Sequence, residues 1–530
     1  MTQAATAEFS KWRLLFWPIH RRELKKFIPM LLIYSLVVFN YSMLKCVKDS
    51  LLITAPSSGA QAIPFVKIWA ILPMAFLSTL IFTRLSNRFN REKVFYILML
   101  SFVGFFLLFA CVFYPYQASL HPHQFADKIQ SMLPIGFQGL IAIFRNWTFT
   151  LFYIMSELWG TIIMSVLFWG FANEVTNIKE AKRFYAILGV GANLATIAAG
   201  QMGILLSSSA LHSKIWMGGD RWGQSIMLIC FLIISTGLIS IAIFRWLSHN
   251  VYQQEIVNSR PLENPETKIK LGIRKNFAYL SKSKYLLCIA IIVLTYNISL
   301  NLIEVIWKNQ VHLLHPYAAD YNIYMGKVIT YVGITSTLFA FFLCGQSMRR
   351  FGWTFSAYIT PVILLLTGIL FFIYLLFQEV GFLGAIASFV GMTPLALCAF
   401  LGSLQNCFSK SCKFTFFDMT KEISFIPLSK ECKLRGKAAI DGVGSRLGKS
   451  GGALIQQFLL LIFGTLAMTT SYVAGILLII FMCWIYAIRS LGKQFKELTE
   501  SNEKLEIADD EPKSEPVFSK EPATASNPTS

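Results

Sequence analysis

Charged residues are scarce in this chain. Asp, Glu, Lys and Arg make up 14% of its 530 residues, while hydrophobic residues make up 55%. Soluble globular proteins have a charged share of about 25%, so the composition predicts a polytopic membrane protein. The net charge of +19 does not indicate a nucleic-acid partner, because basic residues of membrane proteins collect in cytoplasmic loops.

Several kinds of functional site are also missing. The ten cysteines are scattered without a CxxC pair, so we expect reduced thiols and no metal site. The chain has no recognisable nucleotide-hydrolysing domain and no nucleophile with its base, which argues against an enzyme, an ATP-driven pump or a bound cofactor. The N-terminus lacks a short hydrophobic stretch with a cleavage site, so the first span should stay in the mature protein.

Twelve apolar runs are long enough to cross a bilayer. They lie at about 28–50, 63–86, 93–116, 136–175, 181–207, 223–247, 284–310, 324–347, 353–378, 383–418, 436–466 and 470–492. The run at 136–175 is about twice the usual length. We expect it to form one long helix that extends into the cytoplasm, rather than two helices broken near Gly160.

Polar segments divide these spans into two sets of six. We expect a basic N-terminus at 1–27, a six-helix bundle at 28–247, a cytoplasmic linker at 248–283, a second bundle at 284–492 and a disordered tail at 493–530. Basic residues gather in the predicted inner loops, whereas the predicted outer loops at 51–62, 378–383 and 467–470 contain no Lys or Arg. This asymmetry predicts that both termini lie in the cytoplasm.

The two sets of spans repeat each other. GVGANLATIAAG at Gly189–Gly200 aligns with GVGSRLGKSGGA at Gly442–Ala453, at the same relative position in each half. Two pseudo-symmetric six-helix bundles predict an all-α, major-facilitator-like transporter with twelve transmembrane helices. Its substrate site is expected near the membrane midplane between the bundles.

The stretch Gly436–Gln457 combines small residues with charges. Its glycines and serines should let a neighbouring helix approach closely. Gly448, Lys449 and Ser450 spell GKS, but a P-loop needs a glycine where Val443 stands and a strand before it. We therefore expect a helix with a cationic wall, whose charged residues are Lys437, Asp441, Arg446 and Lys449.

Ionisable residues inside spans are costly and mark functional sites. The cations expected to bind substrate phosphates are Lys48, Lys67, Arg145, Arg446 and Lys449. The residues expected to serve coupling or gating are Glu157, Glu304, Lys308, Lys437 and Asp441. In the alternative, Arg446 and Lys449 snorkel or pair with a carboxylate of another helix, and Glu304 and Lys308 only pair with each other. The excess of cations should favour a multiply anionic substrate.

An aromatic stripe accompanies these charges. Arg145, Phe149, Tyr153 and Glu157 follow one another at intervals of four residues, which places them on one face of a helix. The candidates for stacking on a base are Phe149, Tyr153 and Tyr185, although aromatic residues at helical spacing more often serve packing.

Specific motifs now indicate a family. They are ELWG at Glu157–Gly160, FWGFANE at Phe168–Glu174, EAKRFYA at Glu180–Ala186, NLIEVIWK at Asn301–Lys308, GKAAID at Gly436–Asp441 and LGKSGGALIQQ at Leu447–Gln457. From about Phe16 to Leu491 the chain resembles the nucleotide transporters, or ATP:ADP translocases, of obligate intracellular bacteria and plastids.

The resemblance implies a function. It implies exchange of host ATP for bacterial ADP plus phosphate by alternating access in the bacterial inner membrane, independently of the mitochondrial carrier family. It ties to transport the charged residues that match Lys48, Glu157, Glu304 and the lysine of the GKAAID to GKSGG region. The expected partners are ATP, ADP, inorganic phosphate and the lipid bilayer, and the expected oligomeric state is a monomer.

The chain also departs from the family pattern. Lys45 and Cys46 stand where family members commonly have an Arg-Asp pair, and Gln61 and Ser429 stand where acidic residues are common. Fewer carboxylates bear on ion coupling and nucleotide choice. The alternatives are therefore a proton-coupled nucleotide importer, an exchanger for other nucleotides or NAD, and a generic major-facilitator carrier of organic phosphates.

Overall fold

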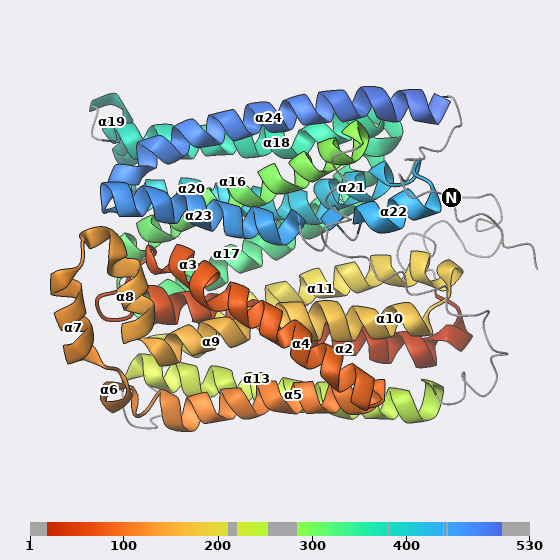
Figure 1. The fold of residues 1–530 in the computed structure, drawn as a ribbon, viewed down its shortest axis with the longest axis horizontal. Coiled ribbons are helices and arrows are strands. Elements are labelled where there is room, and N and C mark those ends of the chain that lie inside the picture. Colours follow the sequence, from red (N-terminus) through yellow and green to blue (C-terminus); the bar gives the residue numbers. More distant parts are fainter. Residues whose placement is uncertain are drawn as a thin grey trace, which may run out of the picture.

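The computed structural model describes residues 19–209, 220–252, 283–378, 381–437, 439–440 and 444–500. Within these ranges the chain folds into helices without a β-sheet. Most helices run side by side along the long axis of the molecule and gather into two halves that follow one another in the chain (Figure 1). The predicted all-α fold is confirmed.

Each half is built from long apolar helices. The N-terminal half contains α2 (Leu24–Ile53), α3 (Ala62–Phe65) continued by η3 (Val66–Ile71) and α4 (Leu72–Arg88), α5 (Arg91–Leu108), α9 (Trp147–Leu158) continued by η6 (Trp159–Phe168) and α10 (Trp169–Val175), α11 (Ile178–Ser207) and α13 (Arg221–Leu247). The C-terminal half contains α16 (Lys284–Leu314), α17 (Ala318–Leu338), α18 (Gly345–Phe377), α20 (Pro394–Cys412) continued by η9 (Lys413–Phe417) and α21 (Asp418–Ser424), α23 (Ser445–Phe463) and α24 (Leu466–Glu500).

Ten helices in the described residues are long and apolar enough to cross a membrane. The predicted tenth and eleventh spans correspond to α20 and α23, which are helical but do not reach that standard over their full length; Leu447–Phe463 is a shorter apolar helix. The polytopic architecture is therefore confirmed, while the number of twelve spans stays a prediction.

The long apolar run at 136–175 is broken, so the prediction of a single long helix is wrong. α8 (Gln138–Arg145) ends at Asn146, whose φ of −105° and ψ of 49° are not helical, and α9 begins at Trp147. The break is stabilised locally because Asn146 Nδ2 donates to Ala142 O at 3.1 Å and Thr150 Oγ1 donates to Ile143 O at 2.8 Å. The alternative break at Gly160 does not occur either, since Gly160 lies within η6.

The ends of the two halves also differ from the expected boundaries. α24 continues to Glu500, so residues 493–500, predicted to be disordered, are helical. η7 (Ser248–Tyr252) continues α13 into the start of the predicted linker. Most of the N-terminal segment, the linker from 253 to 282 and the tail from 501 lie outside the described residues.

The halves meet along several pairs of helices, of which two illustrate the packing. α11 packs against α17, and the contact is close because Gly200 faces the backbone of Gly326: a Cβ at Gly200 would lie 2.6 Å from the Gly326 carbonyl oxygen. On the other side α23 packs against α3, where Gln457 Nε2 donates to Pro64 O at 3.1 Å. The α3–α23 contact lies at the end of the molecule that also carries α7 (His123–Met132) and α8 (Figure 1).

Further polar contacts join the halves near this end. Arg221 Nη2, at the start of α13, lies 3.3 Å from Asp320 Oδ1, at the start of α17. Asn322 Nδ2 of α17 donates to Ser207 Oγ of α11 at 2.9 Å, and Ser50 Oγ of α2 donates to Asn322 Oδ1 at 3.3 Å. We refer to this end as the closed end.

Candidate functional site

The candidate site begins in the last turns of α2. Lys48 Nζ lies 3.0 Å from Asp49 Oδ1 and 3.1 Å from Glu157 Oε1 of α9. It also lies 3.7 Å from the centre of the Tyr153 ring, one turn before Glu157 on α9. The predicted cation, carboxylate and aromatic ring therefore meet within the N-terminal half.

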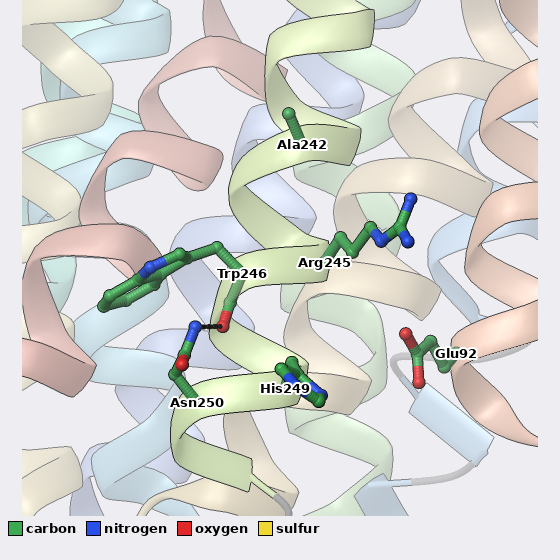
Figure 2. A pocket seen from close by; sticks show the side chains of 6 residues that line it. All are labelled: Glu92, Ala242, Arg245, Trp246, His249 and Asn250. Carbon is green, nitrogen blue, oxygen red and sulfur yellow. Dashed lines mark hydrogen bonds between the residues drawn. The ribbon is translucent and has the colours of Figure 1, made fainter.

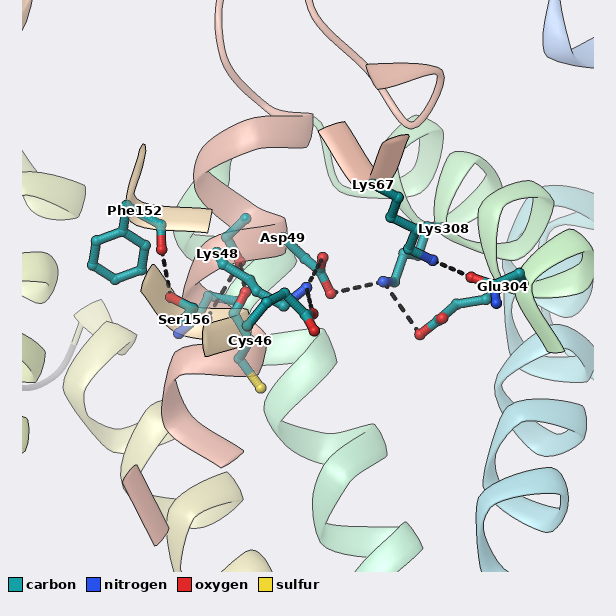
Figure 3. A network of polar contacts seen from close by, with 12 residues as sticks. Cys46, Lys48, Asp49, Lys67, Phe152, Ser156, Glu304 and Lys308 are labelled. Atoms are coloured by element: carbon teal, nitrogen blue, oxygen red, sulfur yellow. Dashed lines mark hydrogen bonds and ion pairs between the residues drawn. The ribbon is translucent and has the colours of Figure 1, made fainter. Parts of the chain in front are cut away.

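The same cluster crosses to the C-terminal half (Figure 3). Lys308 Nζ of α16 lies 2.8 Å from Asp49 Oδ2 and 3.2 Å from Glu304 Oε1. Lys410 Nζ of α20 lies 3.4 Å from the same Glu304 oxygen. Lys48, Asp49, Lys308, Glu304 and Lys410 thus form a continuous series of ion pairs, which together with Glu157 we call the central network.

Burial divides the central network into a sealed middle and two more accessible flanks. The side chains of Lys48, Asp49 and Lys308 are only 1–3% exposed, whereas that of Glu157 is 29% exposed. Charges removed from water are tolerated only when they are paired and hydrogen-bonded. The middle satisfies this condition across the two halves, while Glu157 remains accessible to a solute.

Further cations surround the network. Lys67 of η3 donates a hydrogen bond across the halves to Asn301 Oδ1 of α16. Lys449 is exposed on α23, close enough to Glu157 for the two charges to interact. Lys45 of α2 lies 5.7 Å from the centre of the Tyr41 ring. In the described part of the cluster, six lysines (Lys45, Lys48, Lys67, Lys308, Lys410 and Lys449) accompany three carboxylates (Asp49, Glu157 and Glu304).

This surplus of positive charge decides what the site attracts. Clefts lined by one sign of charge with apolar walls concentrate ions of the opposite sign. The geometry therefore favours a solute with several negative charges, because it would replace carboxylates as the partner of some lysines and neutralise the others.

The small residues of α23 produce the predicted close helix contact. A Cβ at Gly448 would lie 2.8 Å from the Asn297 Cβ, and a Cβ at Gly452 would lie 2.9 Å from the Asn301 Cβ of α16. Gly448, Lys449 and Ser450 all lie inside α23, so the GKS sequence forms a helix and not a phosphate-binding loop. The glycine face holds α23 against α16, and Lys449 is exposed beside it.

The structure brings together seven of the predicted site residues. They are Lys48, Lys67, Tyr153, Glu157, Glu304, Lys308 and Lys449. Asp441 lies outside the described residues, and Arg446 is described only as part of the backbone of α23. Glu304 and Lys308 do pair with each other, but both also pair with residues of other helices.

Two predicted residues lie apart from the central network near the closed end. Arg145 is the last residue of α8, and its Nη2 donates to Asp127 Oδ1 at 2.6 Å and to Gln130 Oε1 at 3.0 Å. Because the helix breaks at Asn146, Arg145 does not continue the stripe of α9. Phe149 is buried, with its ring centre 4.9 Å from that of His121.

The surroundings of Phe149 are those of a packed core. Burial lowers the pKa of His121 to about 4, so this imidazole is neutral near pH 7, and it shares a 2.6 Å hydrogen bond with Thr148 Oγ1. The stripe therefore provides one ring at the network, Tyr153, and one ring for packing, Phe149.

Two other predicted residues lie toward the opposite end of the molecule. Tyr185 donates to Asn173 Oδ1 at 2.6 Å and packs edge-on against Trp169. Lys437 pairs with Glu422, which belongs to the same half. Neither contact includes a member of the central network.

Sequence reasoning missed two members of the network. Lys410 lies within an apolar helix, so the rule that ionisable residues inside spans are functional would have identified it. Asp49 was visible as a charge at the end of the first span, but its role depends on Lys308, which is far away in the sequence. Only tertiary packing reveals that contact.

A separate hollow lies on the N-terminal half. It is lined by residues of α13, η7 and the first turn of α5: Ala242, Arg245, Trp246, His249, Asn250 and Glu92 (Figure 2). None of these residues belongs to the central network, and we do not include the hollow in the site.

Known structures share this arrangement of helices. The fold resembles the crystal structure of a bacterial homologue of the iron transporter ferroportin in an inward-facing state, with a TM-score of 0.51 and 15% sequence identity over 89% of this chain and 99% of the other. The likeness confirms the predicted major-facilitator type of fold.

Sequence relatives are much closer. The chain is 44% identical over 498 residues to ADP,ATP carrier protein 1 of Chlamydia pneumoniae, which covers 93% of this chain and 96% of the relative. It is 42% identical over 484 residues to the chloroplastic ADP,ATP carrier protein 1 of Arabidopsis thaliana, covering 91% of this chain and 76% of the relative. Residues 2–495 match the family model described as TLC ATP/ADP transporter, and this chain therefore belongs to that family.

Proposed function

We propose that this protein is a secondary transporter that exchanges ATP for ADP plus phosphate across a bacterial cell membrane by alternating access. The observation that supports this most directly is the surplus of cations at the junction of the two halves, where the three lysines and three carboxylates of the central network are accompanied by Lys45, Lys67 and Lys449. ATP and ADP carry several negative charges, and charge-assisted bonds to phosphate oxygens are among the strongest polar contacts. The proposal involves no chemical step on the nucleotide.

Lys67 and Lys449 are the cations we assign first to the nucleotide phosphates. Lys67 comes from the N-terminal half, where its partner among the described residues is the neutral amide of Asn301, and Lys449 is exposed on the C-terminal half. A polyphosphate that binds both would connect the halves. Arg446, one turn before Lys449 on α23, is a further candidate on sequence grounds.

Exchange requires that the empty protein reorient slowly. In the structure, Asp49 joins Lys48 and Lys308 across the halves, and Glu157 and Glu304 hold lysines within them. A substrate shifts such an equilibrium only through its differential affinity for the two states. We propose that phosphate groups displace Glu157 and Glu304 from their lysines, and that this displacement permits the halves to move.

The orientation and the membrane follow from the charge distribution and the relatives. Basic inner loops support cytoplasmic termini, which makes the closed end the outer end. The Chlamydia relatives support a bacterial membrane, although plastid relatives also exist. We propose a monomer, because the central network is completed within one chain.

Proteoliposomes test this proposal. Vesicles loaded with ADP and phosphate should take up labelled ATP at least tenfold faster than empty vesicles, and internal nucleotide should leave as ATP enters. An imposed proton gradient should not replace internal ADP. Equal ATP accumulation in empty vesicles under a proton gradient would instead identify a proton-coupled importer, the alternative suggested by Cys46, Gln61 and Ser429.

A further inference from the structure

We propose that the hollow between the start of α5 and the end of α13 binds the head group of a zwitterionic phospholipid, with the phosphodiester against Arg245 and the ammonium group against Glu92. This is the chemistry of phosphatidylethanolamine. The hollow has a volume of about 500 Å³, a size typical of sites for small molecules. The inference concerns the lipid around the protein and does not depend on the transported solute.

The hollow lies where two candidate membrane spans reach the same end of the molecule. α13 begins near the closed end with Arg221, so its last turns, which carry Arg245 and Trp246, lie at the opposite end (Figure 1). Glu92 lies in the first turn of α5, at the start of another span. Basic residues and tryptophans at the ends of spans lie at the level of the lipid head groups. The position of the hollow therefore favours a head group as its occupant.

The exposed face of α13 changes from apolar to polar as it approaches the hollow. Phe231, Leu238, Ala242, Arg245 and His249 are all exposed, and their spacing places them along one face of the helix. The last three of them also line the hollow. An apolar face that ends in basic groups fits a molecule with acyl chains and a charged head group. A soluble anion would leave the apolar part of this face without a partner.

The hollow contains a cation and an anion that do not pair with each other. Arg245 and Glu92 both line it, and in Figure 2 their side chains lie on the same side of α13, away from Trp246. Within the described part of the chain the Arg245 guanidinium has no hydrogen bond or ion pair, and Glu92 has no ion pair. Two opposite charges that share a hollow without contact leave room for a ligand that carries both charges.

The two groups match the two halves of a phosphoethanolamine. The planar guanidinium of Arg245 can donate two parallel hydrogen bonds to phosphate oxygens, and the His249 ring lies beside it on the same face. One oxygen of Glu92 accepts a hydrogen bond from Tyr96 Oη at 2.6 Å, which orients the carboxylate. Its other oxygen can accept from a primary ammonium group, which has three donors.

Other lipid head groups fit this pair of charges less well. A trimethylated ammonium group has no N–H donor for the Glu92 carboxylate. The head group of phosphatidylglycerol has no positive charge, so Glu92 would repel its phosphate without a compensating attraction. The lining of the hollow therefore predicts a preference for phosphatidylethanolamine over both phosphatidylcholine and phosphatidylglycerol.

The experiment measures lipid binding to the full chain in detergent by native mass spectrometry. Phosphatidylethanolamine, phosphatidylglycerol and phosphatidylcholine with identical acyl chains are titrated separately. Arg245→Gln and Glu92→Gln are compared with Lys93→Gln, a matched control because Lys93 is exposed in the same turn of α5 as Glu92 but does not line the hollow. Melting curves establish that each variant is folded.

The wild type should bind phosphatidylethanolamine about tenfold more tightly than the other two lipids, and Arg245→Gln should remove most of this difference, because it deletes a charge-assisted contact. Glu92→Gln should weaken binding of phosphatidylethanolamine and strengthen that of phosphatidylglycerol, since it removes the attraction for one lipid and the repulsion for the other. Lys93→Gln should change neither. A phosphatidylethanolamine with a photoreactive acyl chain should label α13 around Ala242 in the wild type and not in Arg245→Gln.

Four results would overturn the assignment. Equal binding of the three lipids by the wild type, or equal losses in Lys93→Gln and Arg245→Gln, would show that the hollow does not select a head group. Tighter binding of phosphatidylglycerol than of phosphatidylethanolamine would identify a site for anionic lipids instead. Displacement of phosphatidylethanolamine by an equal concentration of soluble glycerophosphoethanolamine would show that the acyl chains contribute nothing and that the occupant is not a lipid.

Discussion

The two halves use the same arrangement of charges with opposite sign. In the N-terminal half the lysine lies on the first helix and the glutamate on the fourth, with Lys48 3.1 Å from Glu157. In the C-terminal half the glutamate lies on the first helix and the lysine on the fourth, with Glu304 3.4 Å from Lys410. A pseudo-symmetric scaffold thus places unlike charges at related positions, where they can attract each other across the interface.

The difference between the halves lies in the number of partners. Lys48 has two carboxylates, Asp49 and Glu157, whereas Glu304 has two lysines, Lys308 and Lys410. Loss of one carboxylate in the N-terminal half leaves Lys48 paired. Loss of Glu304 removes the carboxylate that Lys410 contacts among the described residues, so the C-terminal half should be the more sensitive one.

Neutralising Glu304 should therefore have the largest effect. Breaking a buried ion pair by removing one partner costs about 3–5 kcal/mol. We therefore expect Glu304→Gln to lower the rate of ATP–ADP exchange by about 100-fold or more. Its effect on equilibrium binding of the nucleotides should be smaller. Glu157→Gln should lower it by about tenfold, because Asp49 still holds Lys48 and Glu157 is partly exposed. Initial rates in proteoliposomes, normalised to protein, measure both. Equal losses would contradict the difference between the halves.

Removing the link between the halves should have the next largest effect. Asp49→Asn leaves Lys48 with Glu157 alone and deprives Lys308 of its partner on α2, which should open the closed end. We expect about tenfold faster labelling of Leu460→Cys, a buried position of α23 that packs against Gly136, in a protein without native cysteines. Lys308→Met in the same background removes the other partner of this ion pair and should accelerate labelling as well. If it does not, the Asp49–Lys308 pair does not close this end.

The close contact of α23 offers a test of packing in the C-terminal half. Gly452→Ala would place a Cβ 2.9 Å from the Asn301 Cβ, and we expect it to destabilise the protein by about 1–3 kcal/mol, as overpacking usually does. Gly475→Ala on α24 is the control, because a Cβ at Gly475 has no other atom within 4 Å. Thermal unfolding in detergent compares the two variants. A melting temperature unchanged in both would show that α23 moves away at little cost.

The repeat carries Lys449 in its second copy where the first has Thr196. This difference predicts that the C-terminal half binds the outermost phosphate. Lys449→Gln removes a charge-assisted bond worth about 1.5–3 kcal/mol before solvent screening; because Lys449 is exposed, we expect about tenfold weaker binding of ATP and a smaller loss for AMP. Thr196, the equivalent position of the first repeat, donates to Ala192 O within α11, and Thr196→Val should leave both affinities nearly unchanged. Equal losses for ATP and AMP in Lys449→Gln would argue against a phosphate contact.

The smallest effect is expected at the rim of the closed end. The Arg221–Asp320 pair joins the halves, but its side chains are 36% and 41% exposed, and such pairs contribute about 0–1 kcal/mol. Asp320→Asn should accelerate labelling of Leu460→Cys by less than about fivefold, and the difference from the wild type should shrink further in 1 M salt. If Asp320→Asn had an effect as large as that of Asp49→Asn, the Arg221–Asp320 pair rather than the central network would be the main contact that keeps this end closed.

Much of this architecture was predictable from local patterns. Lysines and glutamates inside apolar runs identified Lys48, Glu157, Glu304 and Lys308, since a charge in a span needs a partner or a solute. The break at Asn146 was not predictable in the same way, because the apolar run continues through it. The break is accompanied by hydrogen bonds from the Asn146 and Thr150 side chains to the carbonyl groups of Ala142 and Ile143 just before it.

The sequence by itself determined the helical class, the approximate spans, the two-fold repeat and the excess of buried cations. Each of these follows from the need to satisfy every backbone hydrogen bond in a bilayer and from the price of charge within it. Only the tertiary structure decided the pairing: that Asp49 meets Lys308, that Lys410 shares Glu304, and that Arg145 turns away toward Asp127. The physical reason is that pairing depends on the rotation and approach of helices distant in the sequence, which their own periodicity does not encode.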